Sequence, residues 1–235
     1  MKKFLLPLTV FVVVAFLGCS KEDGGAARKT IEVKVDTGDI FLFGDMIDEI
    51  VEAPDKFYAE IVSNGIKGVH VGTTTAKVKS GGILYDCKID VSAKHTLYVD
   101  MMYLLGMDKE SIIKLYGEPI RQEGNTYAFN AFPVVGREKG NIFTFENNKV
   151  QLAMIVFSSS YVKQMRDHLD DRYVLATTDN VSSILYINGL DIHSWSIGVL
   201  VQIDASTISA MYASKNYIES SSQKKISSMA AGMLE

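Results

Sequence analysis

The pattern of apolar and polar positions divides the chain into a leader and two differently built regions. Residues 4–17 form an apolar run that only Pro7 and Thr9 interrupt. From about residue 30 to residue 94, apolar and polar residues alternate in short stretches separated by glycine-rich turns. Beyond residue 97, helical spacing and strand-like alternation follow one another. This order predicts an all-β region followed by an α+β region.

The first region, residues 30–96, has the pattern of a small β-sandwich. Residues 31–35 alternate between apolar and charged side chains, which is the period of a half-buried strand. Asn64-Gly65 predicts a hairpin, because a type I′ turn needs positive φ at both central positions. A β-branched stretch, a glycine pair and a strand over residues 83–91 follow. Short strands separated by such turns predict a sandwich.

The second half of this region resembles the bacterial immunoglobulin-like group 2 domain. The resemblance lies in a serine–glycine turn, a G-T-T segment and a strand pair that closes on a cysteine and a valine. It is carried by Ser63, Gly65, Gly68, Gly72, Thr73, Cys87 and Val91. Residues 41–58 lack the family's usual strand with a serine-rich turn, so a shortened sandwich stays an alternative. The resemblance implies a spacer or adhesive module without catalytic residues.

The second region, residues 97–214, combines helices with antiparallel strands. The segment from Asp108 to Tyr116 is a short amphipathic helix, which Gly117 and Pro119 end. A polar turn between two apolar runs predicts a β-hairpin over residues 142–157. Serines 158–160 offer N-cap hydroxyls for a second helix. Its apolar stripe consists of Tyr161, Val162, Met165, Leu169 and Tyr173, and strands are predicted over 184–187, 194–202 and 207–212.

This region resembles the SmpA/OmlA type of small outer-membrane lipoprotein. The resemblance is carried by Leu105, Gly106, Met107, Ile112, Gly117, Pro119, Tyr127, Phe129, Asn148, Lys149 and Val150. It implies short helices packed on an antiparallel sheet, a fold that β-lactamase-inhibitor-like proteins share, and a role beside the outer-membrane barrel-assembly machinery. One helix and about three strands then recur at a period near 50 residues. A tandem repeat and one continuous sheet with two helices both stay open. Residues 215–235 are predicted to be a polar tail, in which Ile226 and Met229 allow a short helix.

The leader has the features of a secretory signal peptide over residues 1–18. Lys2 and Lys3 precede the apolar run. The run has about 14 residues, which at about 1.5 Å per residue is too short to cross a bilayer about 30 Å thick. An uncleaved anchor helix is the alternative.

The leader ends in Leu17-Gly18-Cys19, which resembles the lipobox of bacterial lipoproteins, with Phe16 in place of the usual leucine. The resemblance implies that Cys19 becomes the lipidated first residue, bearing acyl chains such as palmitate. The following Ser20, Lys21, Glu22 and Asp23 are similar to the short tag that sends some lipoproteins to the cell surface. A chance cysteine and a plain solvated linker over residues 19–29 are the alternatives.

Charge and cysteine content exclude several classes of function. The chain carries 24 basic and 28 acidic side chains, a formal charge of −4. Loss of the two leader lysines makes it more acidic, and such a chain lacks the basic footprint of a nucleic-acid-binding protein. If Cys19 is acylated, Cys87 is the only thiol left, so neither a disulfide framework nor a cysteine zinc site can form within one chain. We expect Cys87 to be a small buried hydrophobic residue.

One cluster holds the residue types of a nucleophilic triad. It contains Asp191, His193 and Ser194, followed by Trp195. Triads are assembled across a fold, and neighbouring residues of a strand face opposite sides. A loop that leads into a strand with a buried Trp195 is therefore the favoured interpretation.

A second cluster, Asp167, His168, Asp170 and Asp171, is acidic. On a helix, Asp167 and Asp171 share a face and could bind a cation, but a solvated helix face is the favoured interpretation. His70, which has no nearby ligand-type residue in the sequence, is expected on a strand surface.

These observations predict a non-enzymatic lipoprotein of the outer membrane, exposed on the cell surface. It would act as a binding, adhesion or scaffold module for a protein or glycan partner. We expect no cofactor, metal or catalytic residue. The alternatives are a periplasm-facing accessory factor in outer-membrane assembly or envelope integrity, an inhibitor of an extracellular enzyme, and an enzyme.

Overall fold

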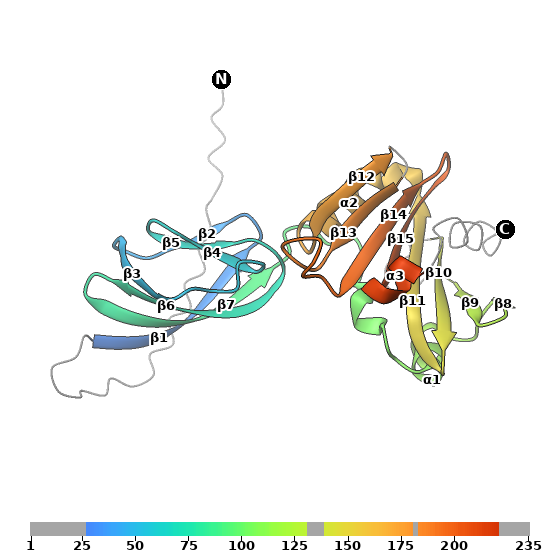
Figure 1. Ribbon diagram of the computed structural model, residues 1–235, viewed down its shortest axis with the longest axis horizontal. Helices are drawn as coiled ribbons and strands as arrows, with labels where there is room; N and C mark the ends of the chain where they lie inside the picture. The colour runs from blue at the N-terminus through green and yellow to red at the C-terminus, as the bar shows by residue number, and fades with distance from the viewer. Residues whose placement is uncertain (1–26, 131–138, 181–182, 221–235) are drawn as a thin grey trace, which may run out of the picture. The chain divides into compact units, whose positions relative to one another are not determined.

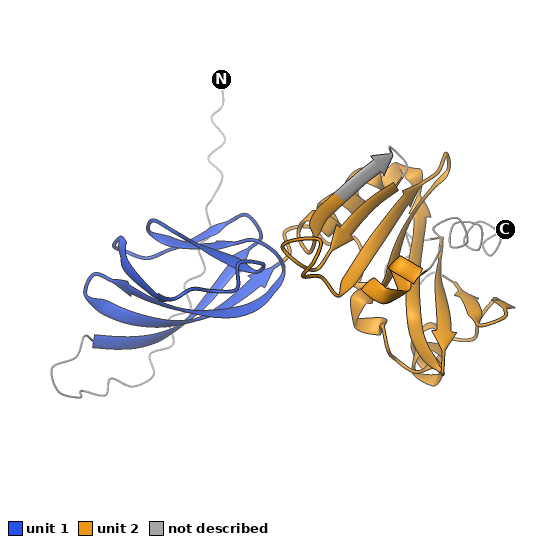
Figure 2. Ribbon diagram, viewed as in Figure 1, with its two compact units in different colours: residues 1–92 blue, residues 93–235 orange. Residues whose placement is uncertain are grey.

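The computed structural model describes residues 27–130, 139–180 and 183–220, with backbone alone for residues 177–180 (Figure 1). The chain forms two compact units, residues 1–92 and residues 93–235 (Figure 2). The predicted leader, Cys19 and the tag from Ser20 to Asp23 lie outside the described residues. Within the described ranges, no helix is both long and apolar enough to cross a membrane.

Unit 1 consists of seven strands in two sheets. Its strands are β1 (Ala27–Asp36), β2 (Ile40–Leu42), β3 (Ile47–Glu52), β4 (Ala59–Val62), β5 (Gly65–Gly68), β6 (Gly72–Ser80) and β7 (Ile83–Ser92). One sheet has the order β1-β7-β6-β3 and the other the order β2-β5-β4. β1 runs parallel to β7, and every other pair is antiparallel.

The core of unit 1 lies between its two sheets. Val33 and Ile89 from the larger sheet are buried together with Ala59 and Ile66 from the smaller one. The alternation along β1 and β7 supplies these contacts, since every second side chain of a strand faces the same side. Cys87 is buried in this core, as predicted. The expected β-sandwich architecture is therefore present in its coarse form, as two sheets around one core.

Two local predictions for unit 1 need correction. β1 begins at Ala27, inside the predicted linker, and the Arg28 guanidinium binds the Asp86 carboxylate of β7 at 2.5 and 3.1 Å. The predicted hairpin exists, but its register pairs Val62 with Gly65, so Gly65 opens β5 and does not form the turn. A Cβ atom at Gly65 would lie 2.3 Å from the Phe41 carbonyl oxygen. The glycine is needed for the close approach of β2, not for positive φ.

Unit 2 is built on one eight-stranded antiparallel sheet with the order β12-β13-β14-β15-β11-β10-β9-β8. Its strands are β8 (Arg121–Glu123), β9 (Thr126–Phe129), β10 (Gly140–Glu146), β11 (Lys149–Ser158), β12 (Val174–Asn180), β13 (Ser183–Ile187), β14 (Ile197–Ile203) and β15 (Thr207–Ser214). Its helices are α1 (Lys109–Tyr116), α2 (Val162–Asp170) and α3 (Lys215–Ser220), with 3₁₀ turns η1 (Met101–Leu104) and η2 (Ser159–Tyr161). α3 occupies the start of the predicted polar tail, which is therefore helical there; residues 221–235 lie outside the described part.

The element order of unit 2 repeats itself. One helix and four strands, α1 with β8 to β11, are followed by α2 with β12 to β15. The last strands of the two halves, β11 and β15, pair at the centre of the sheet, and β8 and β12 form its two edges. Each half thus has four strands where about three were expected.

Local signals placed the elements that join these strands. Asp108 caps α1 by accepting a hydrogen bond from the Ser111 amide at 2.8 Å, and Gly117 ends it with φ of 85°. Asn147 and Asn148, at φ of 50° and 62°, form the tight turn between β10 and β11. The predicted helix and hairpin are both confirmed.

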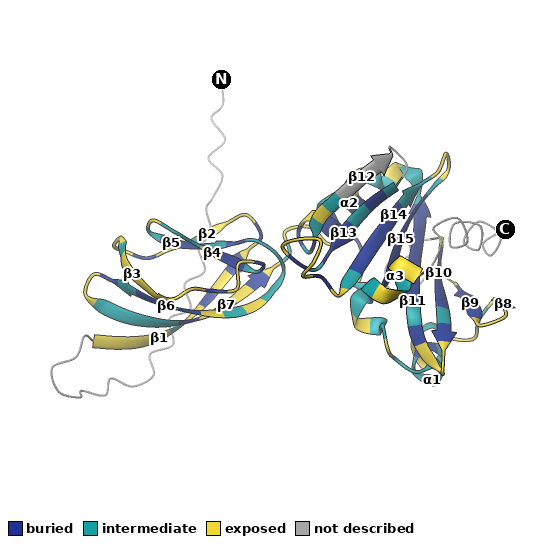
Figure 3. Ribbon diagram, viewed as in Figure 1, coloured by how far each residue is buried: buried dark blue, intermediate teal, exposed yellow. Residues whose placement is uncertain are grey.

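The sheet of unit 2 buries both of its faces (Figure 3). On one face, Phe143 and Tyr212 pack with Ile112 of α1 and Met165 of α2. The stripe predicted for α2 therefore lies in the core. On the opposite face a second apolar cluster gathers: Ala128, Ile142, Leu152, Met154, Val156, Leu200 and Met211.

Candidate interaction site

The β13–β14 loop, residues 188–196, holds the residue types that had suggested a triad. Two of its side chains bind the backbone of the loop. The Asn188 Oδ1 accepts hydrogen bonds from the amides of Ser196 and Ile197, both at 2.9 Å. The Asp191 Oδ1 accepts from the amides of His193 at 2.7 Å and Ser194 at 3.0 Å. These four bonds fix the loop conformation.

Trp195 closes the base of this loop. Its side chain is buried, and its indole N–H donates to the Ile192 carbonyl oxygen at 2.9 Å. The ammonium of Lys215 in α3 lies 5.2 Å from the centre of the ring, within cation–π range. A Cβ atom at Gly189 would lie 2.9 Å from the Ser194 carbonyl oxygen, so the two arms of the loop touch. The predicted loop with a buried tryptophan is confirmed.

The geometry of the loop favours recognition over nucleophilic catalysis. A triad needs the carboxylate to orient the imidazole and the imidazole to bind the hydroxyl. Here the Asp191 carboxylate is occupied by backbone amides, which hold its pKa below the usual value. The Ser194 hydroxyl donates to the Asp191 carbonyl oxygen at 3.4 Å. These groups serve to shape the loop.

The loop presents two large apolar side chains to solvent. Leu190 and Ile192 are 52% and 60% exposed. Fully burying a side chain of this size is worth about 1.5–3 kcal/mol. Because the backbone that carries them is already fixed, little conformational entropy would be lost on binding. This loop is the best candidate for contact with a partner.

The acidic cluster of α2 is only partly solvated. Asp167 pairs with Lys163 one turn earlier at 2.5 Å. His168, in contrast, is fully buried and Asp171 is 8% exposed, so the predicted solvated face is wrong for these two residues. Among the described residues, no group of three possible metal ligands lies close together.

The partners of these buried groups come from the segment that enters unit 2. The Asp171 carboxylate accepts a hydrogen bond from the His95 amide at 2.5 Å, and the His168 Nδ1 accepts from the Leu97 amide at 3.2 Å. The Arg172 guanidinium donates to the carbonyl oxygens of His95 and His168 at 2.9 and 2.8 Å. The end of α2 is thereby tied to the start of the unit.

His168 is held in its neutral form. Burial, and then the nearby Arg172 charge, lower its pKa to about 3. A proton on Nδ1 would also remove the acceptor of the Leu97 amide. The ring lies 4.0 Å, centre to centre, from Tyr98, whose hydroxyl is 2.7 Å from that of Tyr212. The Nε2 atom is buried and has no hydrogen-bond partner in the described structure.

A buried carboxylate completes this polar cluster. The Tyr173 hydroxyl donates to Asp100, whose two oxygens lie 2.7 and 2.9 Å away. The Asp100 carboxylate also accepts from the Met102 amide at 2.9 Å and lies 3.8 Å from the Arg172 guanidinium. Burial raises the pKa of Asp100. The cluster stabilises unit 2 and is closed to solvent.

Two further predictions concern single residues of unit 1. His70 lies in the bend between β5 and β6, not on a strand surface as expected. Its Nδ1 is 2.7 Å from the Phe57 carbonyl oxygen, and its ring stacks on that of Phe57 at 4.6 Å. Burial raises the pKa of Cys87 to about 12, which suits its predicted role as a buried hydrophobic residue.

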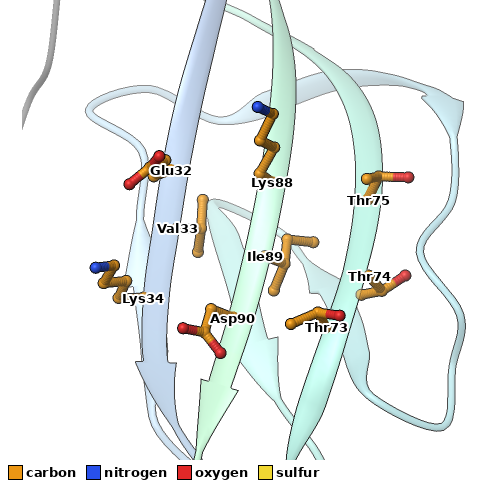
Figure 4. Close-up of a pocket in the computed structure, with 9 residues that line it drawn as sticks. All are labelled: Glu32, Val33, Lys34, Thr73, Thr74, Thr75, Lys88, Ile89 and Asp90. Carbon is orange, nitrogen blue, oxygen red and sulfur yellow. The ribbon is translucent and has the colours of Figure 1, made fainter.

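The outer face of the larger sheet of unit 1 has a shallow depression (Figure 4). The register places Glu32 opposite Lys88 and Lys34 opposite Asp90. Thr73 lies opposite Asp90 on the other side. Because opposite charges face each other across neighbouring strands, a ligand would have to compete with these pairs. The depression is a weaker candidate than the β13–β14 loop.

Sequence reasoning did not assign a role to Asn188, Leu190 or Ile192. The Asn188-Gly189 pair is a turn signal, and an Asp two residues before an amide is typical of side chains that cap turns. Both were available in the sequence. Comparison with protein-family models finds no match to this chain, and comparison with curated proteins finds none either.

Proposed function

We propose that the protein is a non-enzymatic, lipid-anchored binding protein of the bacterial outer membrane that faces the cell exterior. Unit 1 would be an immunoglobulin-like spacer of the group 2 type. Unit 2 would be a tandem pair of SmpA/OmlA-like halves. The β13–β14 loop would contact a protein partner that offers an apolar recess.

The observation that carries this proposal is the fixed loop with its exposed apolar tip. Leu190 and Ile192 stand on a backbone held by Asn188, Asp191 and Trp195. Folding alone gains nothing from exposing them, whereas an interface gains from a rigid apolar anchor surrounded by polar groups.

The start of the folded chain supports the anchoring. β1 begins at Ala27, about eight residues after Cys19, a span of at most about 29 Å when fully extended. Lipidation of Cys19 would therefore hold unit 1 close to the membrane surface. Two or more acyl chains give stable anchoring at about 0.8 kcal/mol per buried CH₂ group.

The repeated order of one helix and four strands supports a tandem origin for unit 2. The two halves meet at the central β11–β15 pair, as expected when one folding unit is copied and the copies share a sheet. A fold of this kind does not specify a function. The functional part of the proposal therefore rests on the loop.

Protease treatment of intact cells tests the location. Loss of the protein while a periplasmic control survives is the expected result. Replacing Ser20, Lys21, Glu22 and Asp23 with neutral residues should then leave the protein protected, and Cys19→Ala should release it from the membrane. Full protection of the unaltered protein would instead favour the periplasm-facing role in outer-membrane assembly.

The binding role is tested by cross-linking on cells. Leu190→Ser with Ile192→Ser removes the apolar tip, and Leu115→Ser on α1 is a matched control, because Leu115 is also exposed. We expect a partner cross-linked to the unaltered and control proteins to be lost from the loop variant. Recovery of the same partners by all three proteins would refute the role of the loop.

A further inference from the structure

One row of apolar side chains crosses the face of the unit 2 sheet that lies opposite α1 and α2. The register places its members directly beside one another on five neighbouring strands. From β9 to β14 they are Ala128, Ile142, Met154, Met211 and Leu200. Each is between 0% and 5% exposed. Neighbouring strands lie about 4.8 Å apart, so the row is about 19 Å long.

α3 covers only the β14–β15 end of this row. A Cβ atom at Gly198 in β14 would lie 2.7 Å from the Ile218 Cδ1, so α3 is seated where the sheet lacks a side chain. Tyr217 packs against the apolar cluster from the same helix. α3 has six residues, which make a helix of about 9 Å. It cannot also cover β10 and β9, although Ile142 and Ala128 there are almost fully buried.

The residues that follow α3 in the sequence fit the remainder of the row. Residues 221–235 begin directly after Ser220, where α3 ends on this face. Their apolar members recur at helical spacing: Ile226, Met229, Ala230, Met233 and Leu234. Lysines and serines occupy the other side of the same helical pattern. As a helix, this segment would be about 22 Å long, close to the length of the row.

We propose that residues 221–235 dock in cis across this row, with Ile226, Met229 and Met233 toward the sheet and Lys224 and Lys225 toward solvent. This is the geometry of an amphipathic helix laid on an apolar groove. The face is then a binding surface occupied by the chain's own segment. The inference rests on the sheet and α3 and is independent of the β13–β14 loop.

A pair of matched variants in the otherwise unaltered chain tests the proposal. Met229→Asp with Met233→Asp places charge on the apolar side, whereas Ser227→Asp with Ser228→Asp places the same charge on the polar side. We expect the first variant to raise the fluorescence of an apolar dye at least twofold and to lower Tm. The second should behave like the unaltered protein. Equal behaviour of the two variants would overturn the proposal.

A second measurement keeps the test decisive if the first variant folds poorly. A chain ending at Ser220 should bind the synthetic peptide 221–235 saturably. Trp195 gives an intrinsic signal, because its ring lies 3.0 Å from the position that a Cβ atom at Gly198 would take, beside Ile218. Absence of binding would refute docking in cis. Dye fluorescence that rises as the unaltered chain is diluted would instead assign the cover to a second copy.

Discussion

Protonation of His168 should make unit 2 sensitive to mild acid. In the folded chain the pKa of His168 is about 3, because burial and the Arg172 charge oppose the imidazolium. In the unfolded chain it returns to about 6.5. The unfolded state therefore binds the proton first as the pH falls. The stabilisation that neutral His168 allows is present above about pH 6.5 and is lost progressively between pH 6.5 and pH 3.

The magnitude follows from the size of this shift. Each pH unit below the unfolded pKa costs about 1.4 kcal/mol, so the free energy of unfolding should fall by about 2 kcal/mol between pH 7 and pH 5 through this group alone. His168→Asn removes the titration and retains an acceptor for the Leu97 amide. Other titrating groups, such as Asp100, are common to both proteins, so the difference between the two proteins isolates the contribution of His168.

The assay is urea unfolding at pH 5, 6 and 7, followed by tryptophan fluorescence. Trp195 is the only tryptophan in the chain and lies in unit 2, so the signal reports that unit. We expect the stability of the unaltered protein to fall more steeply with acid than that of His168→Asn. A stability difference between the two proteins that is the same at all three pH values would refute the reasoning.

Three further predictions concern packing and reactivity. Tyr173→Phe removes the hydroxyl that binds a buried carboxylate and should cost about 1.5–3 kcal/mol, whereas Tyr103→Phe on an exposed ring should cost almost nothing in the same urea titration. Gly65→Ala forces a Cβ atom against a carbonyl oxygen and should cost about 1–3 kcal/mol; Gly44→Ala, where the space is open, is the control, and equal melting temperatures would contradict the contact. Cys87, with its pKa raised to about 12, should react with a maleimide only after unfolding, and rapid labelling of the folded chain would show that the core of unit 1 opens.

The parts of the fold that could be predicted from the sequence are those whose causes are local. The cap at Asp108, the stop at Gly117 and the turn at Asn147-Asn148 each depend on residues within one turn of the chain. Local signals failed where a strand lies at a sheet edge. β8 is polar and fully exposed, so it shows no apolar alternation.

Other features depend on residues that are distant in the sequence. His168 and Asp171 look like surface residues of a helix, and they are buried because the amides of Leu97 and His95, more than 70 residues away, supply their partners. Gly65 looked like a turn residue because the approach of β2 is invisible in the sequence. The β13–β14 loop belongs between these cases, since its turn signals were local and the exposure of its tip was not.

The parallel pairing of β1 with β7 determines how unit 1 responds to force. Ala27 lies beside Ile83 at one end of the ladder, and Asp36 lies beside Ser92 at the other. A pull between the two ends of the unit therefore acts at opposite ends of this pair of strands. The hydrogen bonds of the ladder are then sheared together and cannot open one after another. Unit 1 is built to transmit tension from its first strand to the chain that follows, as a tether must.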